Sequence, residues 1–270
     1  MRFDLRKSLF ILPNLFTLSG IFCGFYAVVL CSLAETEDDL YRACLLIVYA
    51  ILFDMIDGRV ARLTHTQSAF GTQMDSLADV LSFGLAPGLV VYRWSLHSLG
   101  SLGIGASFLF VAAGAIRLAR FNVMSMRQER HRTKRVPPKY VVGLPIPGAA
   151  GILVSLVGAN HAVSGHLPGS PIPVLCLVLV LCFLMVSTVR FRSFKDLHLS
   201  WGTVLTVIAA MGSSAWLALR FHVAFALVWL LTCYVGIGIA EFVYSLTRRG
   251  LQRRELARAA EEEEELTTPS

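Results

Sequence analysis

Residues 41–63 read YRACLLIVYAILFDMIDGRVARL, an apolar run of helical length that ends in two aspartates and two arginines. A helix of roughly 20 apolar residues is needed to cross the hydrocarbon core of a bilayer. A carboxylate near that core is costly and therefore marks a candidate functional site. The stretch predicts a membrane-spanning helix that carries Asp54 and Asp57 to its polar end.

The rest of the chain has the same apolar character. It has 270 residues, of which 55% are hydrophobic and 16% charged, whereas a soluble domain carries about 25% charged residues. Several charge-free stretches are long enough to span a membrane, and no alternating strand pattern is present. Because a lipid-embedded backbone must satisfy its own hydrogen bonds, we expect helices. The fold class is predicted as all-α, a polytopic membrane helical bundle.

Eight candidate spans can be recognised from the apolar runs. They cover about 8–32, 41–63, 71–97, 101–122, 143–161, 171–189, 201–219 and 222–246.

Lysine and arginine predict the orientation of these spans, because cytosolic loops are enriched in both. With the N-terminus inside, 21 of the 24 basic residues fall in segments predicted to be cytosolic. Only Arg42, Arg93 and Arg220 remain for the other side. We therefore expect both termini in the cytosol, an integral inner-membrane location, and an aspartate-bearing edge that faces the cytosol.

Four aspartates have helical spacing at this edge. Asp54 and Asp57 are three apart, and Asp75 and Asp79 are four apart, so each pair occupies one helix face. The short connection 64–70 favours antiparallel packing of the two helices, which would bring the pairs together. Carboxylate oxygens suit Mg²⁺, Mn²⁺ or Ca²⁺. Four carboxylates can hold two such ions, an arrangement that is used in displacement reactions at phosphorus.

The neighbouring residues favour a ligand pocket. Gly58 and Ala61 leave the helix face bare, and Arg62 offers a planar fork to phosphate oxygens. In one alternative, the aspartates are buried ion-pair partners of Arg59, Arg62, Arg93 or Arg117. Such ion pairs would not explain two pairs of aspartates that have helical spacing and are flanked by glycines. Another makes the protein a divalent-cation transporter, but that activity predicts polar residues throughout the bilayer depth rather than at one edge.

The pattern D-x-x-D-G-x-x-A-R-x8-G-x3-D-x3-D, complete from Asp54 to Asp79, resembles the signature of the CDP-alcohol phosphotransferases. Those membrane enzymes transfer a phosphatidyl or phospho-alcohol group from a CDP-linked donor to a hydroxyl and release CMP. The resemblance implies a pair of divalent cations on all four aspartates, with Asp79 as general base, and a homodimer. It also implies nucleotide and pyrophosphate contacts at Gly58, Ala61, Arg62 and Gly71.

Other stretches resemble one branch of this family, the bacterial-type phosphatidylserine synthases. They are residues 12–18, 79–87, 117–122, 143–147 and 190–195. This branch implies CDP-diacylglycerol as donor and L-serine as acceptor; glycerol 3-phosphate or an inositol phosphate stays open as an alternative acceptor. The resemblance covers roughly residues 8–197 and predicts a catalytic membrane domain at 1–197. Beyond it, the apolar runs predict two additional helices at 198–247, and the charged residues predict a cytosolic tail at 248–270.

Further polar residues at the inner edge are candidates for substrate contacts. Asn14 and Thr17 lie one turn apart and could line the nucleotide pocket or hydrogen-bond a neighbouring helix. The serine carboxylate needs a cation, and the acceptor candidates are Arg117, Arg120, Asn122, Arg190 and Lys195. Each basic residue could instead be a topology anchor near lipid phosphates. We expect membrane lipids, and no nucleic acid, as partners of the basic segment 124–142.

Overall fold

The computed structural model describes residues 5–64, 66, 68–130, 140–163, 170–187 and 190–192, with isolated positions at 212–214, 216, 229, 233 and 236. Seven α-helices account for most of the described residues: α1 (Leu5–Leu33), α2 (Glu37–Leu63), α3 (Ala69–Asp79), α4 (Ala86–Trp94), α5 (Ser101–Arg130), α6 (Ile146–Ala162) and α7 (Pro171–Val186). A π-helical segment, Val80–Leu85, joins α3 to α4, and a 3₁₀ turn, Leu96–Leu99, follows α4.

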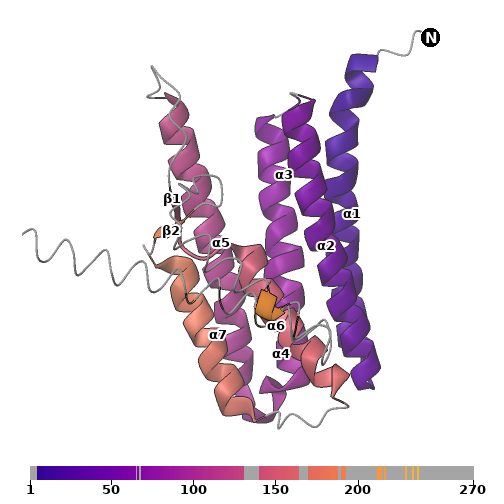
Figure 1. The fold of residues 1–270 in the computed structure, drawn as a ribbon, viewed down its shortest axis with the longest axis vertical. Coiled ribbons are helices and arrows are strands. Elements are labelled where there is room, and N and C mark those ends of the chain that lie inside the picture. The colour runs from indigo at the N-terminus through magenta and orange to yellow at the C-terminus, as the bar shows by residue number, and fades with distance from the viewer. Residues whose placement is uncertain are drawn as a thin grey trace, which may run out of the picture.

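The helices form a bundle in which α1 and α2 run antiparallel side by side (Figure 1). The start of α1, the end of α2, the start of α3 and the end of α5 lie at the same end of the bundle. The segment from α3 through α4 packs between this pair and α5, which contacts α7. The aspartate-bearing parts of α2 and α3 therefore belong to one end of the molecule.

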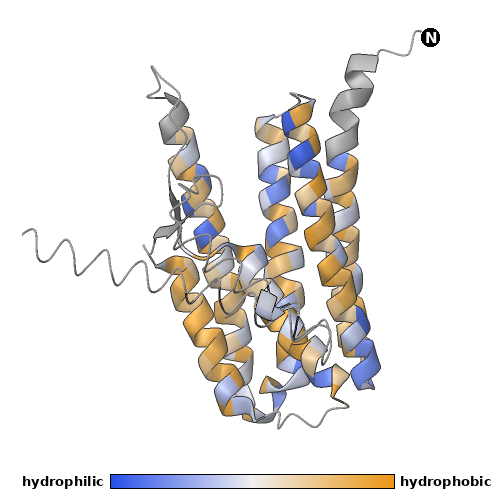
Figure 2. Cartoon of the chain, viewed as in Figure 1, coloured by the Kyte–Doolittle hydropathy of each residue, from blue (hydrophilic) through white to orange (hydrophobic). Residues whose placement is uncertain are grey.

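An all-helical membrane fold is confirmed by length and hydropathy. Within the described residues, three segments are long and apolar enough to cross a membrane: Asn14–Leu33, Ala69–Trp94 and Ser101–Met126. Helices α6 and α7 are apolar but shorter. Figure 2 shows hydrophilic residues in the upper parts of α2, α3 and α5, whereas α7 is mostly hydrophobic. The number of eight spans and their orientation remain predictions, and most of 198–270 lies outside the described residues.

Two helix boundaries differ from the sequence-based expectation by four residues or more. Helix α2 begins at Glu37 because Thr36 caps it: the Thr36 hydroxyl accepts from the Asp39 N–H, and the Asp39 carboxylate accepts from the Thr36 N–H. Helix α5 continues to Arg130, so the first part of segment 124–142 is helix rather than loop. Met, Arg, Gln and Glu in this part are good helix formers, which explains the extension.

Small residues allow α1 and α2 to pack closely. Ala27 and Cys31 of α1 and Ala43, Cys44 and Ile47 of α2 are almost completely buried. Small side chains let helix backbones approach, which is how helices associate in lipid. This contact fixes α1 beside the helix that carries Asp54 and Asp57.

A short two-stranded ribbon was not expected from the sequence. β1 (Tyr140–Val142) pairs antiparallel with β2 (Arg190–Arg192). After β1, Gly143 has φ 78°, and a Cβ on it would lie 2.6 Å from the Met185 carbonyl oxygen. The Leu144 N–H donates to the Leu184 carbonyl at 3.0 Å. The chain entering α6 is therefore tied to the end of α7.

Candidate active site

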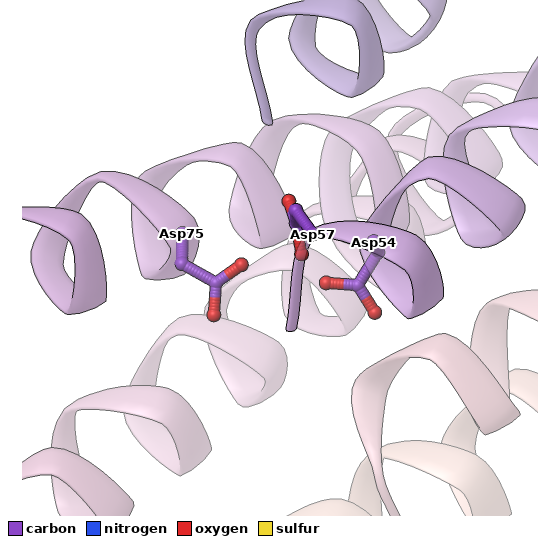
Figure 3. Close-up of side chains that lie close together, drawn as sticks. All are labelled: Asp54, Asp57 and Asp75. Atoms are coloured by element: carbon purple, nitrogen blue, oxygen red, sulfur yellow. The ribbon is translucent and has the colours of Figure 1, made fainter. Parts of the chain in front are cut away.

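Three aspartates from two helices converge in the described structure. Asp54 and Asp57 on α2 and Asp75 on α3 each place a carboxylate oxygen within 4.8 Å of the others. Figure 3 shows these carboxylates turned toward a shared space. The convergence follows from the short connection between α2 and α3, which folds one acidic helix face back onto the other.

Asp79 lines the same pocket one helical turn further along α3. The pocket walls come from α1, α2, α3 and the π-helical segment, with lining residues Thr17, Gly20, Ala50, Asp54, Asp57, Asp75, Ala78, Asp79, Ser82 and Phe83. All four aspartates of the sequence pattern therefore face one pocket. Their roles as ligands and base stay predictions.

The carboxylates of Asp57 and Asp79 are both buried but differ in hydrogen bonding. Asp57 is 5% exposed, and Asp79 is 9% exposed. The Thr17 hydroxyl donates to Asp57 Oδ2 at 2.8 Å. Asp79 Oδ1 is buried and has no hydrogen-bond partner within the described part of the chain. A buried carboxylate oxygen without a protein partner is costly, so this atom is suited to contact a cation or a hydrogen-bond donor.

Among the arginines of the ion-pair alternative, Arg117 acts on Asp79 through its charge. The carboxylate contact between Asp38 and His161, at 2.7 Å, lies at the opposite end of the bundle. Arg93 donates instead to the Ala34 carbonyl, near that same end. A divalent cation therefore fits the acidic pocket: the donors are hard oxygens, they converge, and one of them is orphaned.

The glycine at position 58 is not required by packing. Among the described atoms, a Cβ added there would have a single neighbour within 4 Å, Arg62 Nη2 at 3.9 Å. Glycine inside a helix costs about 1 kcal/mol relative to alanine, and no described contact explains that cost. The open space lies on the helix that carries Asp54 and Asp57, which supports the expectation that a ligand approaches the backbone there. Ala61 is half-buried and Arg62 is exposed.

The space around Gly71 is limited by Ser68, the residue that caps the start of α3. Its N–H donates to Ser68 Oγ at 3.0 Å, which caps α3. A Cβ on Gly71 would lie 3.1 Å from Ser68 Oγ and 3.9 Å from Asn14 Oδ1. Asn14 of α1 therefore lies beside the start of α3, and Gly71 has a structural reason in addition to the expected nucleotide contact.

A π-helical turn follows Asp79 directly, and sequence reasoning missed it. Ser82 in this turn donates to the Gly20 carbonyl of α1 at 3.1 Å. A Cβ on Gly24 would lie 2.3 Å from Ser82 Oγ and 2.8 Å from Ser82 Cα. Such π turns occur frequently at functional sites. The spacing of Ser82, three residues after Asp79, was the available signal for its place in the pocket.

The acceptor candidates occupy different places. The Arg117 charge is close enough to act on Asp79. Arg120 Nη1 donates to the Val186 carbonyl at 3.2 Å, at the end of α7, and Asn122 Nδ2 donates to Ser76 Oγ at 2.8 Å. Of Arg190, only the backbone in β2 is described, and Lys195 lies outside the described residues.

The fold and the pocket define a helical membrane protein with converging carboxylates that can hold a divalent cation. The chain belongs to the CDP-alcohol phosphatidyltransferase family, whose model matches residues 10–240.

Three relatives place the chain within this family. A CDP-diacylglycerol–serine O-phosphatidyltransferase of Helicobacter pylori is 38% identical over 205 residues, covering 75% of this chain and 79% of that protein. A protein of the same name from Methanocaldococcus jannaschii is 32% identical over 194 residues, covering 72% and 79%. An archaetidylserine synthase of Methanothermobacter thermautotrophicus is 36% identical over 145 residues, covering 53% and 56%.

Proposed function

We propose that this chain is a CDP-diacylglycerol–serine O-phosphatidyltransferase, which forms phosphatidylserine and CMP. The family match and the relatives' names support the reaction and its acceptor. The single structural observation that carries the proposal is the pocket in which Asp54, Asp57, Asp75 and Asp79 meet. Transfer from a nucleotide-linked phosphate requires carboxylates that can bind cations and, beside them, a helix face with room for the nucleotide.

The donor is proposed to bind with its acyl chains in lipid and its CDP head in the acidic pocket. Gly58 and Ala61 leave room for the nucleotide beside the α2 backbone, and Arg62 is exposed and can contact a phosphate oxygen. Bound divalent cations, Mg²⁺ or Mn²⁺, would neutralise the pyrophosphate and stabilise the charge on the departing CMP. Asp54, Asp57 and Asp75 would hold them, with Asp79 as a further ligand.

Asp79 is proposed as the general base. Its Oδ1 is buried in the pocket and lacks a partner among the described residues, so it can accept the serine hydroxyl proton. The serine oxygen then attacks the phosphorus that carries diacylglycerol, the bond from that phosphorus to CMP breaks, and CMP leaves. Because a carboxylate is a weak base for an alcohol, proton transfer accompanies bond formation. We favour direct displacement over a covalent intermediate.

Among the candidates whose side chains the structure describes, Arg117 is the best-placed cation for the serine carboxylate. It is half-buried, and its charge acts on Asp79, where the serine hydroxyl must lie. Arg120, by contrast, contacts the end of α7. We propose that Arg117 binds the acceptor and that Arg120 has a structural role.

The membrane arrangement is part of the proposal. The aspartate-bearing end would face the cytosol, as the distribution of lysine and arginine predicts. Both termini would be cytosolic, with eight spans in an inner membrane and two chains in a homodimer. A catalytic domain at 1–197, two further helices at 198–247 and a charged tail at 248–270 complete it.

The test is an acceptor comparison with purified protein in mixed micelles. CDP-diacylglycerol and Mg²⁺ or Mn²⁺ are supplied with L-serine, glycerol 3-phosphate or inositol phosphate in turn, and CMP release is followed. We expect serine-dependent release. If CMP is released only with a phosphorylated acceptor, that compound rather than serine is the substrate. If CMP is released with none of the acceptors, the proposed reaction is rejected.

A further inference from the structure

Helix α1 contributes no aspartate to the pocket, yet it contacts both acidic segments. Thr17 and Gly20 lie on one face of α1, three residues apart, and Gly24 continues that face. Thr17 meets Asp57 of α2, and Gly20 meets Ser82 of the π-helical turn after Asp79. One helix face therefore reaches both sides of the pocket.

The contact at Thr17 is a direct hydrogen bond to a buried carboxylate. The donor–acceptor distance is 2.8 Å, and the two residues are 7% and 5% exposed. A hydroxyl donor on one carboxylate oxygen restricts rotation of the group and leaves the other oxygen for a cation. Hydrogen bonds to charged groups are also stronger than neutral ones.

The contact at Ser82 anchors the segment that follows Asp79. Its hydroxyl donates to the Gly20 carbonyl, and the absence of a side chain at Gly24 lets the Ser82 backbone approach α1. Beside these contacts, the rings of Phe16 and Phe53 meet with centroids 6.5 Å apart, which fixes α1 against the part of α2 next to the pocket.

We propose that α1 is a positioning element for the acidic pocket, in which Thr17 orients Asp57 for cation binding and the Ser82–Gly20 contact holds the turn that carries Asp79. Thr17 is a positioning residue rather than a nucleotide contact, because its buried hydroxyl is directed at Asp57. The proposal rests on the proposed function for its link to catalysis, but its central statement concerns cation affinity.

The experiment measures Mn²⁺ binding by electron paramagnetic resonance on purified protein, without substrates. Thr17→Val removes the hydroxyl with little change in volume, and Thr17→Ser retains it. Loss of a residue that orients a metal ligand weakens metal affinity by about 10- to 100-fold. We expect that loss for Thr17→Val, near wild-type affinity for Thr17→Ser, and a smaller loss for Ser82→Ala.

Ser19→Ala is the matched control. Ser19 is also on α1, and its hydroxyl donates to the Leu15 carbonyl within the helix, without contact to the aspartates. Its Mn²⁺ affinity should equal that of the wild type. Thermal unfolding is recorded for every variant, and if Thr17→Val does not fold, Thr17→Ala carries the same expectation because it removes the hydroxyl without adding volume.

Two results would overturn the proposal. One is unchanged Mn²⁺ affinity in a folded Thr17→Val or Thr17→Ala protein, above all if the KM for CDP-diacylglycerol rises instead. The other is absence of Mn²⁺ binding by the wild type. Failure of the proposed function looks different: Mn²⁺ binds and Thr17→Val weakens it, but serine elicits no CMP release.

Discussion

Gly58→Ala should separate the stability of the fold from the binding of the donor. Position 58 lies in α2, one residue after Asp57, with open space where a side chain would be. If that space receives the CDP head, a methyl group there leaves the free protein intact and obstructs the ligand.

The structure gives the sign and size of each effect. The added Cβ has its closest described neighbour, Arg62 Nη2, at 3.9 Å, which is ordinary contact, so no clash opposes the substitution. Replacing a helical glycine by alanine then stabilises the fold by about 0.5–1 kcal/mol. A methyl group forced against a bound ligand costs about 1–3 kcal/mol, which corresponds to an affinity loss of about 5- to 150-fold.

The assay combines thermal unfolding with the KM for CDP-diacylglycerol at saturating serine. Gly105→Ala is the matched control, because Gly105 is a helical glycine of α5 and no atom of the described residues lies within 4 Å of an added Cβ. Both variants should unfold at a higher temperature than the wild type, and only Gly58→Ala should raise the KM. An unchanged KM in a stabilised Gly58→Ala protein would refute the nucleotide role of this surface.

Further substitutions test other parts of the site. Asp79→Asn should abolish turnover while CDP-diacylglycerol binding, measured by equilibrium dialysis, largely survives; substantial residual serine transfer would exclude Asp79 as base. Gly24→Ala should lower the free energy of unfolding by about 1–3 kcal/mol, because its Cβ would lie 2.8 Å from Ser82 Cα and α1 must move; an unchanged or higher unfolding temperature would contradict that contact. Arg117→Ala should raise the KM for serine, whereas Arg120→Ala should leave it unchanged and cost about 1 kcal/mol of stability through the lost bond to α7; the reverse pattern of KM values would exchange the two roles.

The sequence predicted the helical segments that the structure describes because their signal is local. Apolar runs located helices at the first six predicted positions, of which three are long and apolar enough to cross a membrane, and the two aspartate pairs could be placed on adjoining helices by spacing alone. Their sharing of one pocket required only a short connection between α2 and α3. The extra helical turns at Glu37 and Arg130 lie outside the apolar runs, so hydropathy did not report them.

The missed features depend on contacts between distant residues. The Ser82–Gly20 bond joins positions 62 apart, and a hydrogen bond from Thr17 to a neighbouring helix was one expected alternative, but its partner Asp57, 40 positions away, could not be named from the sequence. The segment Val80–Leu85 is apolar and reads as an ordinary helix, so its π geometry could not be predicted from composition. Pairing of β1 with β2 likewise needs the bundle to bring α5 and α7 together.

The most direct test of the account is product formation by the purified protein with CDP-diacylglycerol, L-serine and Mn²⁺, using mass spectrometry for the lipid and a parallel measurement of CMP. We predict phosphatidylserine and CMP in equal amounts from the wild type. Asp75→Asn, which removes a charge from the converging carboxylates, should lower both by at least about 100-fold. Absence of phosphatidylserine, or full activity in Asp75→Asn, would contradict the central claim that the four-aspartate pocket transfers the phosphatidyl group to serine.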